Sequence, residues 1–269
     1  MKKTLIALIV LLIVLGIFFY VEPGKKEQKR SEKYLVKYKI AILADTHNNQ
    51  EALKQAIIKA KSVETDYFIV LGDFTDYSEK AAFIEQKKIL DEGNIEYCVI
   101  PGDHDIVGKK NEELNWKESD FHEVFRNKVC KSYIEEYKIA TLINPYNYTL
   151  LKEELKDIKH ILENKKVLAL IMSQPIYNPK SNIYMGFFDK EVNKQAIEIL
   201  KNTEKYTQQN NEITVISADT HFFSKYTKNK VNFYTIGALT NKKNLTAPNF
   251  AILEVYSNNS VKVKELLVN

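Results

Sequence analysis

Acidic residues and histidines stand together at the ends of four apolar segments of this 269-residue sequence. Carboxylate oxygens are ligands for hard divalent cations, and a neutral imidazole suits zinc, iron or manganese. Two such cations bridged by one carboxylate would hold a hydroxide nucleophile and clamp a phosphoryl group. The four groups are Asp45-Thr46-His47, Gly72-Asp73-Phe74-Thr75-Asp76, Gly102-Asp103-His104-Asp105 and Ala218-Asp219-Thr220-His221. Their composition predicts a divalent-metal centre that can carry out hydrolysis.

Each group by itself has a more ordinary explanation. A Gly-Asp pair after a strand is usually a turn, and an isolated Asp-x-His is often polar surface. The order of the groups favours the functional interpretation, because each follows an apolar segment and the first three are about 30 residues apart.

The apolar segments before the first three groups predict buried strands at 38–44, 67–71 and 95–100. Helical spacing predicts helices at 51–61 and 78–90 between them, so the strands are expected to be parallel. Ligands of such sheets bind outside the carboxyl ends of the strands, where these groups lie. A strand at 213–218 leads to the fourth group, and the rest of the C-terminal third predicts antiparallel strands. No linker divides residues 38–269, which predicts one domain.

Polar residues next to the predicted helices are candidates for helix caps. Asn48 or Asn49 is placed to cap the helix at 51–61, and Asp76 or Ser78 the helix at 78–90. A role for the asparagines in contacting a substrate is the alternative.

The ordered set of groups resembles that of the calcineurin-like metallophosphoesterases. Their pattern is Asp-x-His, Gly-Asp-x-x-Asp, Gly-Asn-His-Asp/Glu, His-x-Pro and Gly-His-x-His, and the likeness runs from about Tyr38 to the end of the chain. The resemblance implies an α/β fold, a four-layer α/β sandwich of two mixed β-sheets flanked by helices. It also implies a phosphoesterase site with two divalent metal ions, whose identity (Mn, Fe, Zn or Mg) stays open.

The resemblance assigns roles to individual positions. It makes Asp73 the bridging carboxylate, His104 the residue that contacts the phosphate and assists the leaving group, and Asp105 the acid that orients His104. Asp76 matches the last acid of its motif and is either a helix cap or a supporting residue. The expected ligands of the first metal are Asp45, His47, Asp73 and His221.

Three departures from the family pattern fall on the second metal. Asp103 replaces the usual Asn, Ser173 the His of His-x-Pro, and Asp219 the first His of Gly-His-x-His. A serine hydroxyl is a poor ligand, and Gln174 would point to the other face if the strand continued. Asp103 and Asp219 can both act as oxygen ligands. The second site therefore either has harder, oxygen-rich ligands and prefers Mn²⁺ or Mg²⁺, or it binds metal weakly and is often empty.

The N-terminus predicts a membrane anchor. Residues 4–21 carry no charge. A helix of this length is about 27 Å long, which is just enough to span a thin bilayer. No small-x-small cleavage site follows, so residues 1–21 are interpreted as an uncleaved signal anchor, a single transmembrane helix, with a cleaved signal peptide as the alternative. Residues 22–37 form a basic juxtamembrane linker, and 38–269 the catalytic domain.

Charge and cysteine content bear on location and partners. Residues 1–37 hold eight Lys/Arg and three Glu, a net charge of +5, whereas the remaining 31 basic and 32 acidic residues give −1. This balance disfavours a nucleic-acid partner. The basic residues after the span argue for a cytoplasmic domain, and the short basic start argues for export, which we favour. Cys98 is compatible with a buried thiol, so Cys98 and Cys130 do not settle the compartment.

Together these features predict a membrane-tethered metallophosphoesterase, a hydrolase that cleaves a phosphate mono- or diester by attack of a metal-activated hydroxide. The substrate could be a small molecule, a nucleotide or a lipid-linked phosphate. The alternative is a catalytically weak or inactive protein of the same fold that acts as a binding module. The loss of two imidazoles favours that alternative, and the retained His104-Asp105 pair favours the enzyme.

Overall fold

The computed structural model describes residues 34–106, 117, 119–145, 148–209, 211–242, 244 and 246–268. The predicted signal anchor at 1–21 lies outside the described residues, as does most of the basic linker. Within the described ranges, no helix combines the length and the apolar character needed to cross a membrane. The first strand begins at Val36, so the last two residues of the predicted linker belong to the folded domain.

The first sheet has five strands in the order β11-β10-β1-β2-β3. Strands β1, β2 and β3 are parallel, as their connecting helices require, whereas β10 runs antiparallel to both β1 and β11. The sheet is therefore mixed, and residues from the two ends of the domain pair at its centre. The strands are β1 (Val36–Ala44), β2 (Tyr67–Leu71), β3 (Tyr97–Ile100), β10 (Asn249–Tyr256) and β11 (Val261–Leu267).

The second sheet has six strands in the order β4-β5-β6-β7-β9-β8. Strands β5, β6, β7 and β9 are parallel, and the two edge strands are antiparallel to their neighbours. The expectation of antiparallel pairing in the C-terminal third was therefore wrong for the pairing of β9 with β7, although β9 is antiparallel to β8. The strands are β4 (Tyr133–Ile134), β5 (Ile139–Leu142), β6 (Ala169–Met172), β7 (Thr214–Ser217), β8 (Ser224–Lys228) and β9 (Val231–Thr235).

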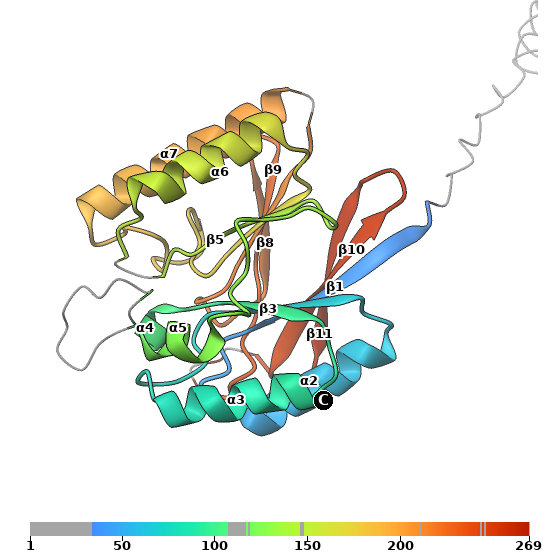
Figure 1. The fold of residues 1–269 in the computed structure, drawn as a ribbon. Helices are drawn as coiled ribbons and strands as arrows, with labels where there is room; N and C mark the ends of the chain where they lie inside the picture. The colour runs from blue at the N-terminus through green and yellow to red at the C-terminus, as the bar shows by residue number, and fades with distance from the viewer. Residues whose placement is uncertain are drawn as a thin grey trace, which may run out of the picture. The chain divides into compact units, whose positions relative to one another are not determined.

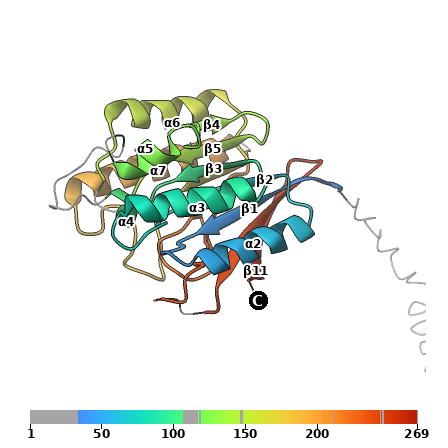
Figure 2. The same ribbon diagram turned by 60° about the horizontal axis from the view of Figure 1, so that its bottom comes forward.

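Helices cover the outer face of each sheet, as Figures 1 and 2 show. The two long helices α6 (Lys152–Asn164) and α7 (Lys190–Gln208) pack their apolar faces on the second sheet. The helices α2 (Gln50–Ser62), α3 (Lys80–Glu92) and α5 (Asp120–Phe125) do the same on the first. The sequence predicted the two mixed sheets and the flanking helices, and the structure confirms them.

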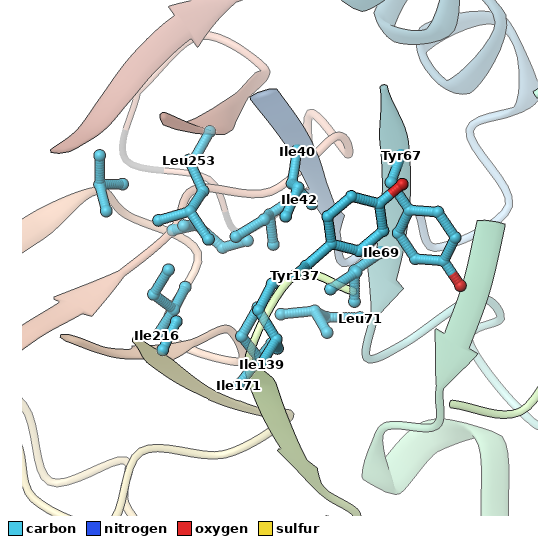
Figure 3. Close-up of a cluster of buried hydrophobic side chains, with 14 of the residues drawn as sticks. Ile40, Ile42, Tyr67, Ile69, Leu71, Tyr137, Ile139, Ile171, Ile216 and Leu253 are labelled. Carbon is cyan, nitrogen blue, oxygen red and sulfur yellow. The ribbon is translucent and has the colours of Figure 1, made fainter. Parts of the chain in front are cut away.

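The inner faces of the two sheets enclose a hydrophobic core (Figure 3). Aliphatic side chains from both sheets meet there, and Tyr137 makes ring contacts with Tyr38 and Tyr67. Full burial of one such aliphatic side chain is worth about 1.5–3 kcal/mol. This core fixes the position of the strand ends of the first sheet relative to those of the second. The labelled residues are Ile40, Ile42, Tyr67, Ile69, Leu71, Tyr137, Ile139, Ile171, Ile216 and Leu253.

A disulfide joins Cys98 of β3 to Cys130, 32 residues further along the chain. Val129, next to Cys130, forms a parallel bridge with Val99, so this segment continues the sheet beside β3. The interpretation of Cys98 as a buried thiol was therefore wrong. The bond cross-links the strand that leads into the Gly102–Asp105 loop, because β3 ends at Ile100.

The helix caps are only partly as expected. Asn49 caps α2, because its side chain accepts a hydrogen bond from the backbone N–H of Ala52. The first residue before α3 is Glu79, which makes no capping hydrogen bond. The prediction that Asp76 or Ser78 caps α3 was wrong, and both side chains bond elsewhere.

Candidate metal centre

Four loops converge at the carboxyl ends of β1, β2, β3 and β7. The backbone N–H of Asp45 donates to the carbonyl of Leu71, and that of Gly72 to the carbonyl of Ile100, which ties the first three loops together. The loop from the second sheet joins them, because the backbone N–H of Asp219 donates to Oδ2 of Asp45 at 3.0 Å. The fold therefore brings together residues that are 174 positions apart.

The two Ala-Asp-Thr-His segments share an unusual backbone. Asp45 and His47 have φ values of 49° and 43°, and Asp219 and His221 have φ values of 69° and 55°. A left-handed conformation costs a non-glycine residue roughly 1–2 kcal/mol, and such positions are concentrated at functional sites. The loops after β1 and β7 thus share this backbone conformation at both their aspartate and their histidine.

The three side chains of the first cluster are within ligand distance of one another. His47 Nε2 lies 3.4 Å from Asp73 Oδ2 and 3.2 Å from His221 Nε2. One possible ligand atom from each residue lies within 4.8 Å of the others, and all three residues are buried. Two imidazole nitrogens and a carboxylate oxygen in such proximity are an arrangement that a divalent cation could bind.

Asp45 adds a fourth side chain, and a second carboxylate, to this cluster. The residue is fully buried, and its Oδ1 has no hydrogen-bond partner, whereas Oδ2 accepts the N–H of Asp219. A buried carboxylate oxygen without a donor is unfavourable unless a cation lies beside it. All four expected ligands of the first metal therefore face one region, although only His47, Asp73 and His221 satisfy the 4.8 Å distance.

A carboxylate fixes the orientation of His47. Nδ1 of His47 donates to Oδ1 of Asp76 at 3.0 Å, and Oδ2 of Asp76 accepts from Lys242 Nζ at 2.6 Å. A hydrogen bond to one ring nitrogen leaves the other for a metal, the arrangement common to histidine ligands. Asp76 is therefore the supporting residue that the resemblance offered as its second role. Lys242 was not predicted, because it lies far away in the sequence in a loop without a motif.

Two glycines make room for the carboxylates. A Cβ atom on Gly72 would lie 2.6 Å from Oδ1 of Asp45, and one on Gly102 would collide with Oδ1 of Asp73. Gly72 also has a φ of 59°, which any larger residue would adopt at a cost. These glycines allow the loop backbone to approach the carboxylates closely.

His104 and Asp105 follow β3 in a short helical turn, α4 (Asp103–Ile106). Nδ1 of His104 donates to the carbonyl of Asp76 at 2.7 Å, and its ring centroid lies 5.2 Å from that of His47. The structure thus places His104 at the metal centre. Asp73, Asp103 and His104 also form a second set with potential ligand atoms within 4.8 Å of one another.

Asp105 acts on the backbone of the loops. Its Oδ1 accepts the N–H groups of Phe74 and Thr75, and its Oδ2 accepts that of Gly102. The expectation that Asp105 orients the imidazole of His104 is thus corrected: its carboxylate ties the two loops together, and Asp76 supplies the carbonyl that Nδ1 bonds.

The Ser173 region differs most from the sequence expectation. Oγ of Ser173 donates to Oδ1 of Asn144 at 3.3 Å. The side chain of Gln174 does not point to the opposite face, because its Nε2 donates to Oδ2 of Asp219 at 3.2 Å. Asn144 and Gln174 are site residues that sequence reasoning missed.

A small cavity separates these residues from the first cluster. Its volume of ≈ 10 Å³ is about the space that one water molecule needs. The lining includes both glycines of the strand ends and the two substituted aspartates. The lining residues are Asp45, Gly72, Asp73, Gly102, Asp103, Pro145, Ser173, Gln174 and Asp219.

The pKa values of the carboxyl groups reflect their burial first and their mutual repulsion second. Burial, followed by the charge of Asp73, raises the pKa of Asp103 to about 7. Burial and neighbouring carboxylates also raise the pKa values of Asp45 and Asp219 well above the usual range. Burial acts in the same direction on Asp73, but the hydrogen bond and charge of His47 lower its pKa. Asp73 is therefore the anion at the centre of the cluster.

These features fit divalent cations. Buried carboxylates that repel one another, an unpartnered Oδ1 on Asp45 and a histidine oriented through Nδ1 are the donor set that such ions require. Asp45, His47, Asp73 and His221 could hold one divalent cation, and Asp73, Asp103 and Asp219 offer oxygens in the adjoining cavity.

Comparisons with known proteins agree with this geometry. A family model described as calcineurin-like phosphoesterase matches residues 38–223. The fold is similar to that of a dimetal phosphatase from Danio rerio, with a TM-score of 0.59 and 9% identity over 87% of this chain and 98% of that one. A search of curated proteins found no match.

Two further solved structures share the fold. A purple acid phosphatase from yellow lupin seeds has a TM-score of 0.59 at 11% identity over 86% of this chain and 51% of its own. GAP50, the anchor in the inner membrane complex of Plasmodium, has a TM-score of 0.57 at 14% identity, over 87% of this chain and 86% of its own. At these identities the likeness shows the fold alone.

Proposed function

The chain belongs to the calcineurin-like phosphoesterase family, and from this premise we propose that it hydrolyses a phosphate mono- or diester with two divalent cations while anchored to a membrane. The observation that carries the proposal is the convergence of His47, Asp73 and His221 within ligand distance, with His104 beside them. A metal-dependent hydrolase of phosphoric esters needs such a cluster, whereas a purely structural domain does not.

Two sets of side chains would hold the cations. Asp45, His47, Asp73 and His221 form the first set, and Asp73 would be shared with the oxygens of Asp103 and Asp219. When bound, the cations supply Lewis-acid polarisation of the phosphoryl group and lower the pKa of a water. The shared carboxylate explains why Asp73 lies at the centre of both groups of potential ligands.

His104 serves as the proton-transfer residue of this proposal. Its Nδ1–H donates to the carbonyl of Asp76, so proton exchange with the leaving oxygen would run through Nε2. The carboxylate of Asp105 supports this geometry indirectly, because it holds the loops of Phe74 and Gly102 together. The carbonyl of Asp76 and the loops that Asp105 holds together thus determine the position of His104.

Residues 4–21 and the disulfide support an extracytoplasmic location. An uncharged segment of this length suits a single membrane span, and a disulfide such as Cys98–Cys130 persists mainly in oxidising compartments. A membrane-impermeant maleimide applied to intact cells that carry an Ile58→Cys variant tests the location, because Ile58 is 68% exposed whereas Cys98 and Cys130 are buried. Labelling of the variant on intact cells is expected, and labelling only after cell lysis would place the domain on the cytoplasmic side.

Hydrolysis of a panel of esters tests the proposed activity. The full-length chain is treated with a chelator and then given Mn²⁺, Mg²⁺, Zn²⁺ or Fe²⁺ with aryl phosphomonoesters, phosphodiesters, nucleotides and lipid-linked phosphates. Activity that depends on an added metal is expected for at least one ester class. No hydrolysis above that of the chelated protein, with any metal, would contradict the proposal.

A non-catalytic binding module is the second candidate, and one observation favours it. The side chain of Ser173 is hydrogen-bonded to Asn144, and that of Asp219 to Gln174. Neither residue has the imidazole that the family pattern places there. The double variant Ser173→His/Asp219→His separates the two functions. Hydrolysis only in the double variant would mark the natural protein as a binding module, whereas hydrolysis in the natural protein supports the enzyme.

A further inference from the structure

Gln174 is the least expected side chain of the metal centre. The residue is 1% exposed, and it lines the small cavity together with Asp73, Asp103 and Asp219. Its Nε2 donates to Oδ2 of Asp219, while its Oε1 is buried without a hydrogen-bond partner. A buried amide oxygen without a donor is unfavourable unless it faces a cation or a donor from outside the chain.

Asn144 determines the position of Gln174. Oδ1 of Asn144 accepts the backbone N–H of Gln174, and Nδ2 donates to its carbonyl at 2.9 Å. These two bonds hold the backbone just after β6 and orient the side chain toward Asp219. In this orientation the amide N–H faces the carboxylate of Asp219, and Oε1 is left without a donor. Oε1 is therefore held in place by the surrounding hydrogen bonds.

From this arrangement we propose that Oε1 of Gln174 is a ligand of the second cation. Gln174 thereby replaces, from the neighbouring position, the imidazole that Ser173 cannot provide. The second site becomes an all-oxygen site made of Asp73, Asp103, Asp219 and Gln174, beside the histidine-containing first site. The inference rests on the proposed two-metal centre but not on its catalytic activity.

The composition of the site determines which cation it takes. Carboxylate and carbonyl oxygens suit Mg²⁺ and Mn²⁺, whereas imidazole suits Zn²⁺. Three carboxylates and one neutral amide oxygen therefore favour Mg²⁺ or Mn²⁺ at the second site. The first site, with His47 and His221, keeps its affinity for Zn²⁺. The two sites of one chain thus differ in metal preference.

Gln174 could instead act only through its N–H donor, by orienting Asp219. Two variants separate this role from that of a ligand. Gln174→Glu keeps an oxygen ligand and removes the donor, while Gln174→Met keeps the size of the side chain and removes both. A ligand role predicts that Glu is tolerated, whereas a donor role predicts that both variants fail, because Glu would also repel Asp219.

Calorimetric titration of the chelator-treated, full-length chain with Mn²⁺ alone and with Zn²⁺ alone tests the proposal. Two binding events are expected for Mn²⁺ in the natural protein. Gln174→Met should weaken the weaker event by at least about tenfold and leave the tighter one unchanged. Gln174→Glu should retain the weaker Mn²⁺ event or strengthen it. Gln174→His should shift the preference of the weaker event toward Zn²⁺.

Each result has a defined meaning. A weaker event that is equally reduced in Gln174→Glu and Gln174→Met would overturn the ligand role, as would one that is unchanged in both. If Gln174→Met also loses the tighter event, its folding is affected, and Gln174→Glu alone then decides. Absence of both events in the natural protein would contradict the proposed metal centre itself.

Discussion

At the scale of single residues, Asp73 connects the two groups of potential ligands in the candidate metal centre. It belongs to both sets of potential ligands, and its backbone and side chain contact three loops. His104 lies next to it but donates its Nδ1–H to a carbonyl. Replacement of the two residues should therefore have different effects, because the proposed mechanism uses Asp73 to hold metals and His104 to move a proton.

Replacement of these two residues tests that division. Asp73→Asn keeps the size of the side chain but removes the charge that both cations would share, so hydrolysis of an aryl phosphate and metal binding should both be lost. His104→Gln should lower turnover by roughly 10²–10⁴-fold. Turnover and metal content measured on the same samples check both expectations. Unchanged activity in Asp73→Asn would contradict the mechanism.

Asp76 is predicted to act on metal affinity through His47. Asp76→Asn keeps the shape of the side chain but weakens the hydrogen bond to Nδ1, so the affinity of the tighter Mn²⁺ event should fall on the order of 10–100-fold. The matched control is Lys242→Met. Lys242 is 66% exposed and pairs with the other oxygen of Asp76, and an exposed ion pair is worth at most about 1 kcal/mol. Equal losses in the two variants would contradict the role of Asp76.

The loops after β1, β2 and β3 are the elements on which the site depends. Their glycines let one loop backbone approach the carboxylate of the next, as for Gly102 and Asp73. The carboxylate of Asp105 then ties the loops together through three backbone N–H groups. The position of each ligand is thus a property of neighbouring loops and not of its own loop alone.

Gly102→Ala is expected to damage both stability and metal binding. The new Cβ would collide with Asp73, including its backbone nitrogen, so the loops must separate at a cost of about 1–3 kcal/mol. Gly93→Ala is the control, because its Cβ would meet its nearest neighbour at 3.2 Å. Urea unfolding and Mn²⁺ titration measure both effects. A Gly102→Ala protein with the stability and Mn²⁺ affinity of the Gly93→Ala protein would contradict the packing argument.

For the whole molecule, bound metal should raise thermal stability. The cluster contains buried carboxylates, and burial and neighbouring carboxylates raise the pKa values of Asp45 and Asp219. A ligand that binds only the folded state stabilises the folded state. At a Mn²⁺ concentration of 100 times Kd the gain is about 2.7 kcal/mol, which corresponds to roughly 5–10 °C in Tm. Calorimetry of the chelated and Mn²⁺-loaded protein measures it. A shift as large in Asp73→Asn would show that Mn²⁺ acts at another place.

Much of the molecule could be predicted from local patterns. The three parallel strands, the helices between them and the positions of Asp45, Asp73 and His104 follow from apolar periodicity and from polar residues at strand ends. The pairing of β10 with β1 and the parallel pairing of β9 could not be predicted in this way, because strand partners are chosen by the packing of distant segments. The disulfide between Cys98 and Cys130 was missed for the same reason.

The amino-acid sequence by itself determined the chemistry of the site: which residues could bind metals, in what order they occur, and where two imidazoles are replaced. Only the tertiary structure decided which atoms meet. It joined His47 to His221 across 174 positions, turned Gln174 toward Asp219, and placed Asp76 between His47 and Lys242. The reason is physical: a side chain's type is local, whereas its direction depends on loops and hydrogen bonds that distant strands bring together.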